Sequence, residues 1–452
     1  MTAAQFAALS PLVVLAIATV VAMMLVPFAR LQTVMWAAAG GLALAAALEL
    51  LRIGAPAAPM GALLTDDGLA RFGTIYVCLV SLGALAFLRT GHPAKEAPSL
   101  LLLVAIGAVT LAGAGHVATL FLGIEIVGLS LIALFAYRLT KPGLEAAYKF
   151  LVMSGLASSA LLLGAALIYA ESGSLDFAHW RSGGALAALG TALLLAGLAF
   201  KFSLVPFHMW TPDAFEASPA SAAVLAGVVS KSAVAIVVLR IAAAHLPEPV
   251  WSSGLAALGA ASVLLGNLLA LRQPQLPRML GYSTIAHSGY LALIIASGAP
   301  LASEAVLFYL GAYAPAMLAA LCVSAALGRA PTLPDLHGLW KRRPLETSAL
   351  ALALFSLAGL PAAGGFVAKL YLLRVLIDGG LWTLVAIVVA GSSLGFFYYA
   401  RFITAPFLGA SHEDAEPMPL FDRGLLLLCM ALIVLFGIAP QVLIELVRTA
   451  SP

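Results

Sequence analysis

Long apolar runs separated by short polar segments make up most of the chain. A helix needs about 20 apolar residues to cross a hydrocarbon core roughly 30 Å thick, so runs of that length predict membrane spans. The fourth run is short and the twelfth is long. The predicted spans, about fourteen in all, lie near residues 8–28, 34–51, 72–88, 98–113, 116–137, 147–170, 185–207, 219–244, 250–271, 278–298, 302–328, 345–376, 380–403 and 424–447.

The continuity of these runs distinguishes between the two ways of crossing a membrane. Their apolar residues are consecutive rather than alternating, which favours helices over a β-barrel. Composition agrees, because 63% of the residues are hydrophobic and 10% are charged, whereas soluble domains carry about 25% charged residues. The sequence therefore predicts an all-α polytopic membrane protein.

No linker or low-complexity tract divides the chain, so we expect one membrane domain over residues 1–452. Within it, residues 1–97 are expected to form helices 1–3, and residues 424–447 helix 14. The amino terminus lacks the basic segment and the small-residue cleavage site of a signal peptide, so the first apolar run is expected to remain as a span.

Lys and Arg residues fall unequally on the two sides of the predicted membrane. Those that follow odd-numbered spans are Arg30, Arg89, Lys95, Arg138, Lys141, Arg272, Arg278, Arg329, Lys341, Arg342, Arg343, Arg401 and Arg423. Those on the opposite side are Arg52, Arg71, Arg181, Arg240 and Arg448. Cytoplasmic loops carry the positive excess, so both termini are predicted on the periplasmic side. The net charge of +3 is then a feature of topology, not of nucleic-acid binding.

Two spans contain helix-breaking residues near a lysine. The span with Lys201 runs through Pro206. The span with Lys369 is interrupted upstream by Gly359, Pro361, Gly364 and Gly365. Broken backbone is tolerated at membrane depth only inside a bundle or beside a hydrated cavity. Because paired breaks in two halves are typical of inverted repeats around a midplane site, we predict repeats at about 98–244 and 250–403.

Glu125 lies near the middle of its predicted span, in TLFLGIEIVGLSLIALF, with no other charge from His116 to Tyr137. An ionisable residue at this depth is costly and needs an explanation. Burial favours the neutral carboxyl, whereas a nearby cation favours the carboxylate. Glu125 is therefore either a neutral, hydrogen-bonded core residue or a proton carrier coupled to a lysine on another helix.

Three lysines on three spans lie among apolar or small residues: Lys201, Lys231 and Lys369. A single lysine near a helix end commonly extends its ammonium group to the lipid headgroups. Three together, two of them near helix breaks, favour a functional explanation, because each costs about 2.5–3.5 kcal/mol near a helix centre. Burial favours the neutral amine, so such a lysine can hold or release a proton as a neighbouring charge moves. That is the chemistry of a proton relay.

Two further ionisable residues, Lys149 and His287, each have two possible roles. Lys149 begins the sixth span with Glu145 one helical turn before it, so it is either half of a surface ion pair or part of the relay. His287, in GYSTIAHSGY, lies several residues into an apolar run. It is either a hydrogen-bonded core residue or part of a proton wire, because imidazole titrates near physiological pH.

Other polar groups carry weaker signals. His208, Asp213 and Glu216 follow the Lys201 span in a segment that we expect to be a cap or gate rather than a metal site. The three cysteines are widely separated, which argues against disulfides, zinc or an iron–sulfur cluster. Phosphate-binding, dinucleotide-binding and haem-attachment motifs are missing, so we expect no redox centre or cofactor in this chain.

Several ordered motifs resemble a known family. They are LFLGIEIVGLSLIAL, EAAYKFLVMSGLASSALLLG, GLAFKFSLVPFHMWTPDAFEASP, GNLLALRQPQLPRMLGYSTIAHSGY and FSLAGLPAAGGFVAKLYLL. Together they are similar to the antiporter-like subunit N family of bacterial proton-translocating NADH-quinone oxidoreductase, respiratory complex I, over roughly residues 98–403. The resemblance implies fourteen transmembrane helices with two inverted five-helix repeats, in which helices 7 and 12 are broken.

The resemblance also implies roles for single residues. Glu125 would be the carboxylate of helix 5, Lys201 the central lysine of broken helix 7, and Lys231 the bridging lysine of helix 8. His287 would belong to the hydrated axis, and Lys369 would be the terminal lysine of broken helix 12. Quinone reduction elsewhere in the complex would then drive changes in the pairing of Glu125 with Lys201.

Partners and location follow from the same resemblance. Neighbouring membrane-arm subunits, including other antiporter-like ones, would contact this chain in the bacterial inner membrane. NADH, FMN, iron–sulfur clusters and quinone would belong to partner subunits. Two alternatives remain at this point: a subunit of a multisubunit cation/proton antiporter or membrane-bound hydrogenase, and a non-conducting scaffold that holds partner subunits.

Overall fold

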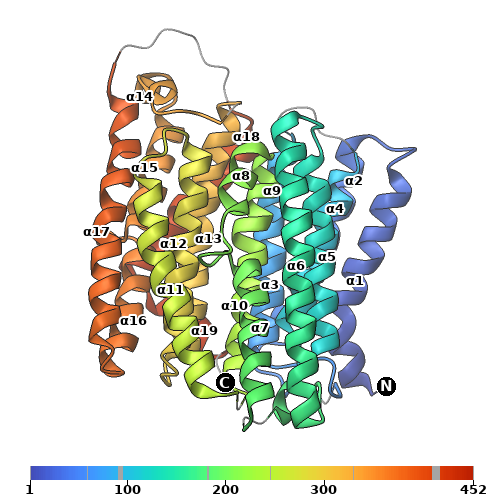
Figure 1. Ribbon diagram of the computed structural model, residues 1–452. Helices are drawn as coiled ribbons and strands as arrows, with labels where there is room; N and C mark the ends of the chain where they lie inside the picture. Colours follow the sequence, from blue (N-terminus) through green and yellow to red (C-terminus); the bar gives the residue numbers. More distant parts are fainter. Residues whose placement is uncertain are drawn as a thin grey trace.

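The computed structural model describes residues 2–58, 60–89, 95–180, 183–244, 246–328, 330–409 and 418–450, with no β-strand among them. Its helices stand side by side in a bundle, and both chain ends lie at the same end of it (Figure 1). The helices of the first half are α1 (Ala3–Leu25), α2 (Leu31–Leu50), α3 (Gly68–Ala86), α4 (Ala97–Ala112), α5 (Val117–Ala136), α6 (Lys141–Ser172), α7 (Ala185–Phe202), α8 (Trp210–Ala217), α9 (Ala220–Val224) and α10 (Ser230–Ala242).

The second half is also helical. Its helices are α11 (Glu248–Ala270), α12 (Leu276–Ala296), α13 (Ala302–Ala326), α14 (Leu339–Arg342), α15 (Pro344–Ala358), α16 (Gly364–Asp378), α17 (Trp382–Thr404), α18 (Leu420–Ile438) and α19 (Gln441–Arg448). A π-helical turn, Leu225–Val229, joins α9 to α10 into one continuous span.

Twelve helices among the described residues are long and apolar enough to cross a membrane. The predicted short fourth run is the shorter apolar helix α4, and the predicted long twelfth run is divided into the shorter apolar helix α15 and the helix α16. The predicted run 424–447 comprises two helices, because α18 ends at Ile438 and α19 begins after Pro440. The predicted repeats at 98–244 and 250–403 stay a prediction.

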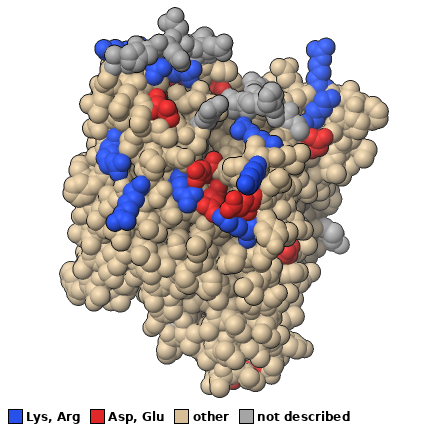
Figure 2. All heavy atoms as spheres, turned by 45° about the horizontal axis from the view of Figure 1, so that its top comes forward, with Lys and Arg blue, Asp and Glu red and all other residues tan. Residues whose placement is uncertain are grey.

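Basic side chains gather over the end of the bundle opposite the two termini, as the unequal distribution of Lys and Arg predicted (Figure 2). Two of the residues in that distribution, Arg181 and Arg329, lie outside the described residues. Which end faces the cytoplasm stays a prediction.

Both predicted helix breaks are present and have the same construction. In the first, Ser203 takes a left-handed conformation (φ 60°) after α7, and the amides of Ser203 and Leu204 bond back to the carbonyls of Phe200 and Ala199. In the second, Gly359 (φ 78°) follows α15, and the amides of Gly359 and Leu360 bond back in the same pattern. This closing motif satisfies some carbonyls of the last turn and leaves others for side chains.

An ion-pair network at the end of the bundle that carries the termini ties α2, α3 and the intervening loop together. Asp66 accepts hydrogen bonds from Arg52 (2.6 Å) and Arg71 (3.1 Å). Next to it, Asp67 caps α3 and accepts both guanidinium nitrogens of Arg240 on α10, at 2.6 and 2.7 Å. The N-terminal helices are thereby fixed to the helix that carries Lys231.

Candidate functional site

Glu125 on α5 and Lys201 on α7 both make a hydrogen bond to helix α6. The hydroxyl of Ser158 on α6 donates to Glu125 Oε1 at 2.5 Å. One turn earlier on α6, Ser154 Oγ accepts a hydrogen bond from Lys201 Nζ at 2.6 Å. Lys201 is 6% exposed, and Glu125 acts on it electrostatically. The structure thus brings together the carboxylate and lysine that the sequence predicted, and does so through two serines.

Lys231 lies beside Lys201 at the break that ends α7. Its Nζ donates to the backbone carbonyl of Lys201 at 2.9 Å and to Ser203 Oγ, which in turn is bonded to Thr211 Oγ1 on α8 at 2.5 Å. The break leaves that carbonyl without a helical partner, and the carbonyl end of a helix favours a cation. A buried lysine is therefore stabilised at this position by the broken helix itself.

Aromatic rings enclose the two ammonium groups. Lys231 Nζ lies 4.4 Å from the centre of the Trp210 ring, and Lys201 Nζ lies 5.6 and 6.0 Å from the Phe200 and Phe150 rings. Cation–π contacts of this kind stabilise a desolvated ammonium. A cavity of about 10 Å³ adjoins Lys201 and Gly128, which is close to the least space that one water molecule needs.

Lys369 repeats this arrangement at the second break. It lies on α16, and its Nζ donates to the carbonyl of Ala358, the last residue of α15, at 2.7 Å. The Tyr290 ring lies 5.5 Å from the same ammonium. Gly359 makes this approach possible, because a Cβ at that position would lie 2.5 Å from the Lys369 side chain. In each break, a lysine thus binds a carbonyl that the interrupted helix leaves free.

His287 lies at the centre of a group of tyrosines between the two lysine sites. Hydrogen bonds join its Nδ1 to Tyr309 Oη (2.6 Å) and its Nε2 to Tyr399 Oη (3.3 Å), and Tyr399 continues to Ser283 (2.5 Å). The charge of Lys369 acts on His287. His287 is 6% exposed, so the structure gives this imidazole polar partners on both sides in an otherwise apolar span.

A second hydrogen-bonded line lies next to the His287 group. Tyr290 Oη bonds to Ser392 (3.2 Å) and to Asn267 Nδ2 (3.3 Å), and Tyr398 Oη donates to Asn267 Oδ1 at 3.0 Å. Helices α11, α12 and α17 therefore meet through hydroxyls and an amide rather than through apolar side chains alone.

Lys149 lies apart from the buried residues, on the charged end of the bundle. Its side chain is 47% exposed, and its Nζ pairs with Glu145 (2.7 Å) and Asp213 (2.9 Å). Asp213 also pairs with Arg278 on α12 at 2.9 Å, and Arg278 reaches Glu216 at 2.5 Å. Figure 2 shows acidic and basic side chains side by side on this face. The expected Glu145–Lys149 pair is present, as part of a group that links α6, α8 and α12.

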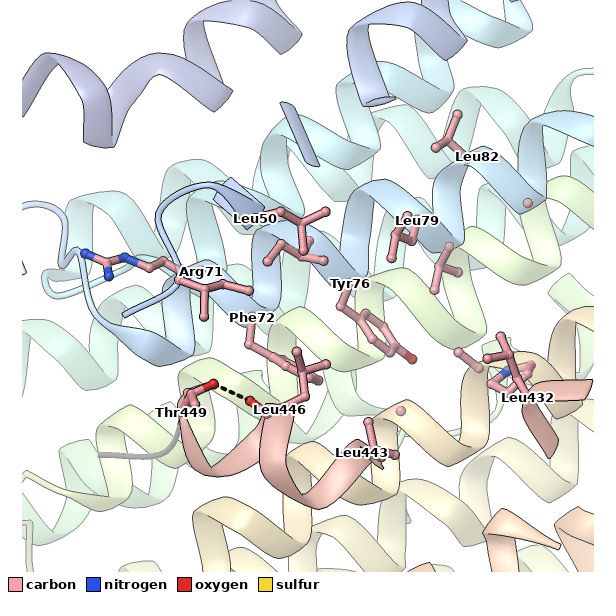
Figure 3. Close-up of a pocket in the computed structure, with 18 of the residues that line it drawn as sticks. Leu50, Arg71, Phe72, Tyr76, Leu79, Leu82, Leu432, Leu443, Leu446 and Thr449 are labelled. Carbon is pink, nitrogen blue, oxygen red and sulfur yellow. Dashed lines mark hydrogen bonds between the residues drawn. The ribbon is translucent and has the colours of Figure 1, made fainter. Parts of the chain in front are cut away.

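A cavity of about 820 Å³ lies elsewhere, between α3, α13, α18 and α19. Figure 3 shows that Leu79, Leu82 and Leu432 line it, with Arg71 near one end. Arg71 is committed to Asp66 and to the backbone carbonyls of Arg52, Ala55 and Pro56. The cavity is almost wholly apolar and contains none of the predicted relay residues.

Sequence reasoning missed the hydroxyl and amide partners of the relay residues. Ser154, Ser158, Tyr309, Tyr399 and Asn267 are bonded to them or to their neighbours. The available signal was the occurrence of polar residues in apolar spans. Serine and tyrosine are common at helix interfaces in membranes, so that signal does not identify which of them face an ionisable group.

Comparison with known proteins shows the family of the chain. The family described as NADH:quinone oxidoreductase/Mrp antiporter, transmembrane, matches residues 114–395, more than half of the chain. The chain is 64% identical, over 100% of its length and 99% of the relative's, to NADH-quinone oxidoreductase subunit N of Rhodopseudomonas palustris (strain BisA53). It is 48% identical, over 99% of its length and 100% of the relative's, to the protein of the same name from Cereibacter sphaeroides (strain ATCC 17025 / ATH 2.4.3).

Solved structures share the architecture. A chain of respiratory complex I from Thermus thermophilus with bound aureothin aligns with a TM-score of 0.88 at 32% identity, covering 96% of this chain and 98% of that one. An archaeal membrane-bound sulfane sulfur reductase gives 0.88 at 26% identity, covering 99% and 97%. The Mrp complex of Dietzia sp. DQ12-45-1b gives 0.89 at 22% identity, covering 100% and 97%, which is a likeness of fold alone.

Proposed function

Because the chain belongs to the NADH:quinone oxidoreductase/Mrp antiporter family and is an antiporter-like, proton-translocating membrane subunit of NADH-quinone oxidoreductase, we propose that a set of ionisable residues, of which three lysines and a histidine are buried and Glu125 is half-buried, is the proton relay. The relay comprises Glu125, Lys201, Lys231, His287 and Lys369, with Lys149 at its exposed end. The chain's partners are other membrane-arm subunits of this respiratory complex.

The observation that carries the proposal is that the ionisable residues and their polar partners lie on helices that pack against one another across the bundle. Ser158 and Ser154 connect Glu125 to Lys201, whose carbonyl binds Lys231. Helices α10 and α12 pack against each other, which brings the Lys231 and His287 helices together, and α12 packs against α16, which carries Lys369. Three lysines and a histidine with 9% exposure or less at membrane depth are too costly to be incidental.

The driving step follows from the electrostatics of the first pair. When Glu125 is ionised and close, Lys201 is favoured as the ammonium; when that charge is neutralised or moved, Lys201 releases its proton. Lys231 receives the same signal, because the charge of Lys201 acts on it. Quinone reduction in partner subunits drives this alternation, and protons move along and across the membrane as a result.

This chain's own part in catalysis is the movement of protons, not of electrons. We assign NADH, FMN, the iron–sulfur clusters and quinone to partner subunits. The three cysteines, Cys78, Cys322 and Cys429, are buried and unpaired by disulfides, and the described residues contain no group of three or more metal-ligating side chains. We also place both termini on the periplasmic face of a bacterial inner membrane, with support from the basic side chains at the opposite end (Figure 2).

Lys201→Ala tests the relay. The substituted complex is first shown to assemble, and quinone reduction and proton pumping are then measured in membrane vesicles. Lys141→Ala is the matched control, since Lys141 is an exposed lysine at the start of α6. We expect turnover and pumping to collapse together in Lys201→Ala and to persist in the control.

Three results would redirect the assignment. Wild-type turnover and pumping in the assembled Lys201→Ala complex would make Lys201 structural and overturn the relay. Failed assembly of Lys201→Ala, with normal pumping in a Lys201→Met complex that does assemble, would favour a scaffold. Transport that requires sodium in the wild-type vesicles would favour cation/proton antiport.

A further inference from the structure

Two serines of α6, Ser154 and Ser158, bind the two charged side chains that the proposed relay couples, Lys201 and Glu125. Glu125 and Lys201 make no direct ion pair; each instead bonds to its own hydroxyl, Ser158 at 2.5 Å and Ser154 at 2.6 Å. The two serines are four residues apart, so they lie on the same face of α6, about 6 Å apart along its axis. Helix α6 thus binds both side chains, Glu125 and Lys201, through serines on one of its faces.

The two hydroxyls have opposite roles. Ser158 donates to the carboxylate, which stabilises the ionised form of Glu125. Ser154 accepts from the ammonium, which stabilises the protonated form of Lys201. Hydrogen bonds to charged groups are the strong ones, so each serine biases the proton affinity of its partner.

The surroundings contain few competing charges. Lys201 is faced by Glu125 from α5 and by Lys231 from α10, while α7 and α8 contribute the Phe200 and Trp210 rings. Helix α6 contributes hydroxyls and the Phe150 ring. The charged residue of α6 that is nearest to these serines in sequence is Lys149, and it forms ion pairs with Glu145 and Asp213 at the surface.

We infer that Ser154 and Ser158 are positioning residues of the relay, which set the electrostatic coupling between Glu125 and Lys201 by holding each in a separate hydrogen bond. The inference rests on the proposed function. Because both hydrogen bonds end on α6, a displacement of this helix changes the positions in which Glu125 and Lys201 are held.

The surface ion pairs give α6 a defined position. Lys149 lies five residues before Ser154 on the same helix and is tied through Asp213 to Arg278 on α12. These ion pairs connect the helix that carries the serine pair to α8 and α12.

The test uses the assembled complex with Ser154→Ala and Ser158→Ala, and records quinone reduction and pumping against pH. Ser159→Ala is the matched control, because Ser159 is an exposed serine on the same helix whose hydroxyl bonds only to the Gly155 carbonyl. Ser154→Thr and Ser158→Thr retain the hydroxyl and serve as rescue variants.

The two variants are expected to move opposite limbs of the profile. Ser154→Ala shifts the alkaline limb to lower pH, because the ammonium has lost an acceptor. Ser158→Ala shifts the acid limb to higher pH, because the carboxylate has lost a donor. Each shift is about one pH unit, as the loss of one hydrogen bond to a charged group predicts. The threonine variants and Ser159→Ala keep the wild-type profile.

Profiles of Ser154→Ala and Ser158→Ala that match Ser159→Ala would overturn the inference. Equal loss of rate at every pH, without restoration by threonine, would also overturn it and make the serines merely structural. If an alanine variant does not assemble, the cysteine variant at the same position carries the same prediction. Lys201→Ala in parallel separates the two ideas: pumping that fails there while the serine variants behave as wild type removes only this inference.

Discussion

The ammonium nitrogen of Lys231 lies 2.9 Å from the backbone carbonyl oxygen of Lys201, at the point where α7 is interrupted. One lysine of the relay is therefore held by the main chain of another. Lys369 has the same relation to Ala358 at the end of α15. The helix breaks thus provide binding positions for cations, as well as the polar backbone that a hydrated path needs.

Lys231→Met removes this contact while keeping the length of the side chain. The Lys201 carbonyl and the Ser203 hydroxyl lose their buried donor, which costs about 1–3 kcal/mol at the break. We expect pumping and quinone reduction to fall at least about fivefold, the factor that corresponds to about 1 kcal/mol. Vesicle assays on the assembled complex check this, with exposed Lys341→Met as control; equal rates in the two variants would contradict it.

Glu125→Gln separates hydrogen bonding from charge. The amide oxygen of glutamine accepts from Ser158, as the carboxylate does, but it does not act electrostatically on Lys201. We expect assembly to remain normal and pumping to fall by about tenfold or more, because Lys201 loses the negative charge that acts on it. The control Glu445→Gln alters an exposed carboxylate on α19, away from the relay, and should pump at nearly the wild-type rate.

Tyr399→Phe probes the His287 group by removing one oxygen atom. The hydroxyl links His287 Nε2 to Ser283, and the ring itself is buried. Two buried polar atoms lose a partner, so we expect a loss of several-fold to about tenfold in pumping with little change in assembly. The exposed tyrosine of α6 provides the comparison, because Tyr148→Phe should have no effect. Normal pumping in Tyr399→Phe would remove this hydroxyl from the path.

Asp66 gives a prediction for stability outside the membrane spans. Burial opposes its charged form, but hydrogen bonds from Arg71, the Ala58 amide and Arg52 outweigh that effect and hold the pKa of Asp66 below its ordinary value. A carboxylate with a lowered pKa stabilises the folded state above its unfolded-state value, and that stability is lost as pH falls through the folded-state value. We expect thermal stability to decline below about pH 4.

Asp66→Asn measures this contribution directly. It leaves buried Arg71 without its carboxylate, and breaking a buried ion pair costs about 3–5 kcal/mol. Thermal unfolding of the purified complex at neutral pH should therefore begin at a lower temperature. Asp378→Asn, in an ion pair whose partners are both more than half exposed, should unfold like the wild type. Identical unfolding of the two variants would contradict the prediction.

The family assignment and the fold were accessible from the sequence, as were the breaks near Pro206 and Gly359. Each rests on local physics. Length and hydropathy decide whether a segment crosses a bilayer, and Pro and Gly decide where a helix is interrupted. The cost of burial singles out Glu125 and Lys201 without any knowledge of their neighbours.

The partners of those residues depended on the tertiary structure. Nothing in the sequence distinguishes Ser154 and Ser158, which bind charged groups, from Ser159, which faces outward and bonds to its own helix. Which face of a span turns inward is set by packing against other helices, because apolar residues occupy both faces in lipid. Lys149 shows the same division. Its pair with Glu145 could be predicted because the two residues are one helical turn apart, whereas its pair with Asp213 exists only because α6 and α8 pack together.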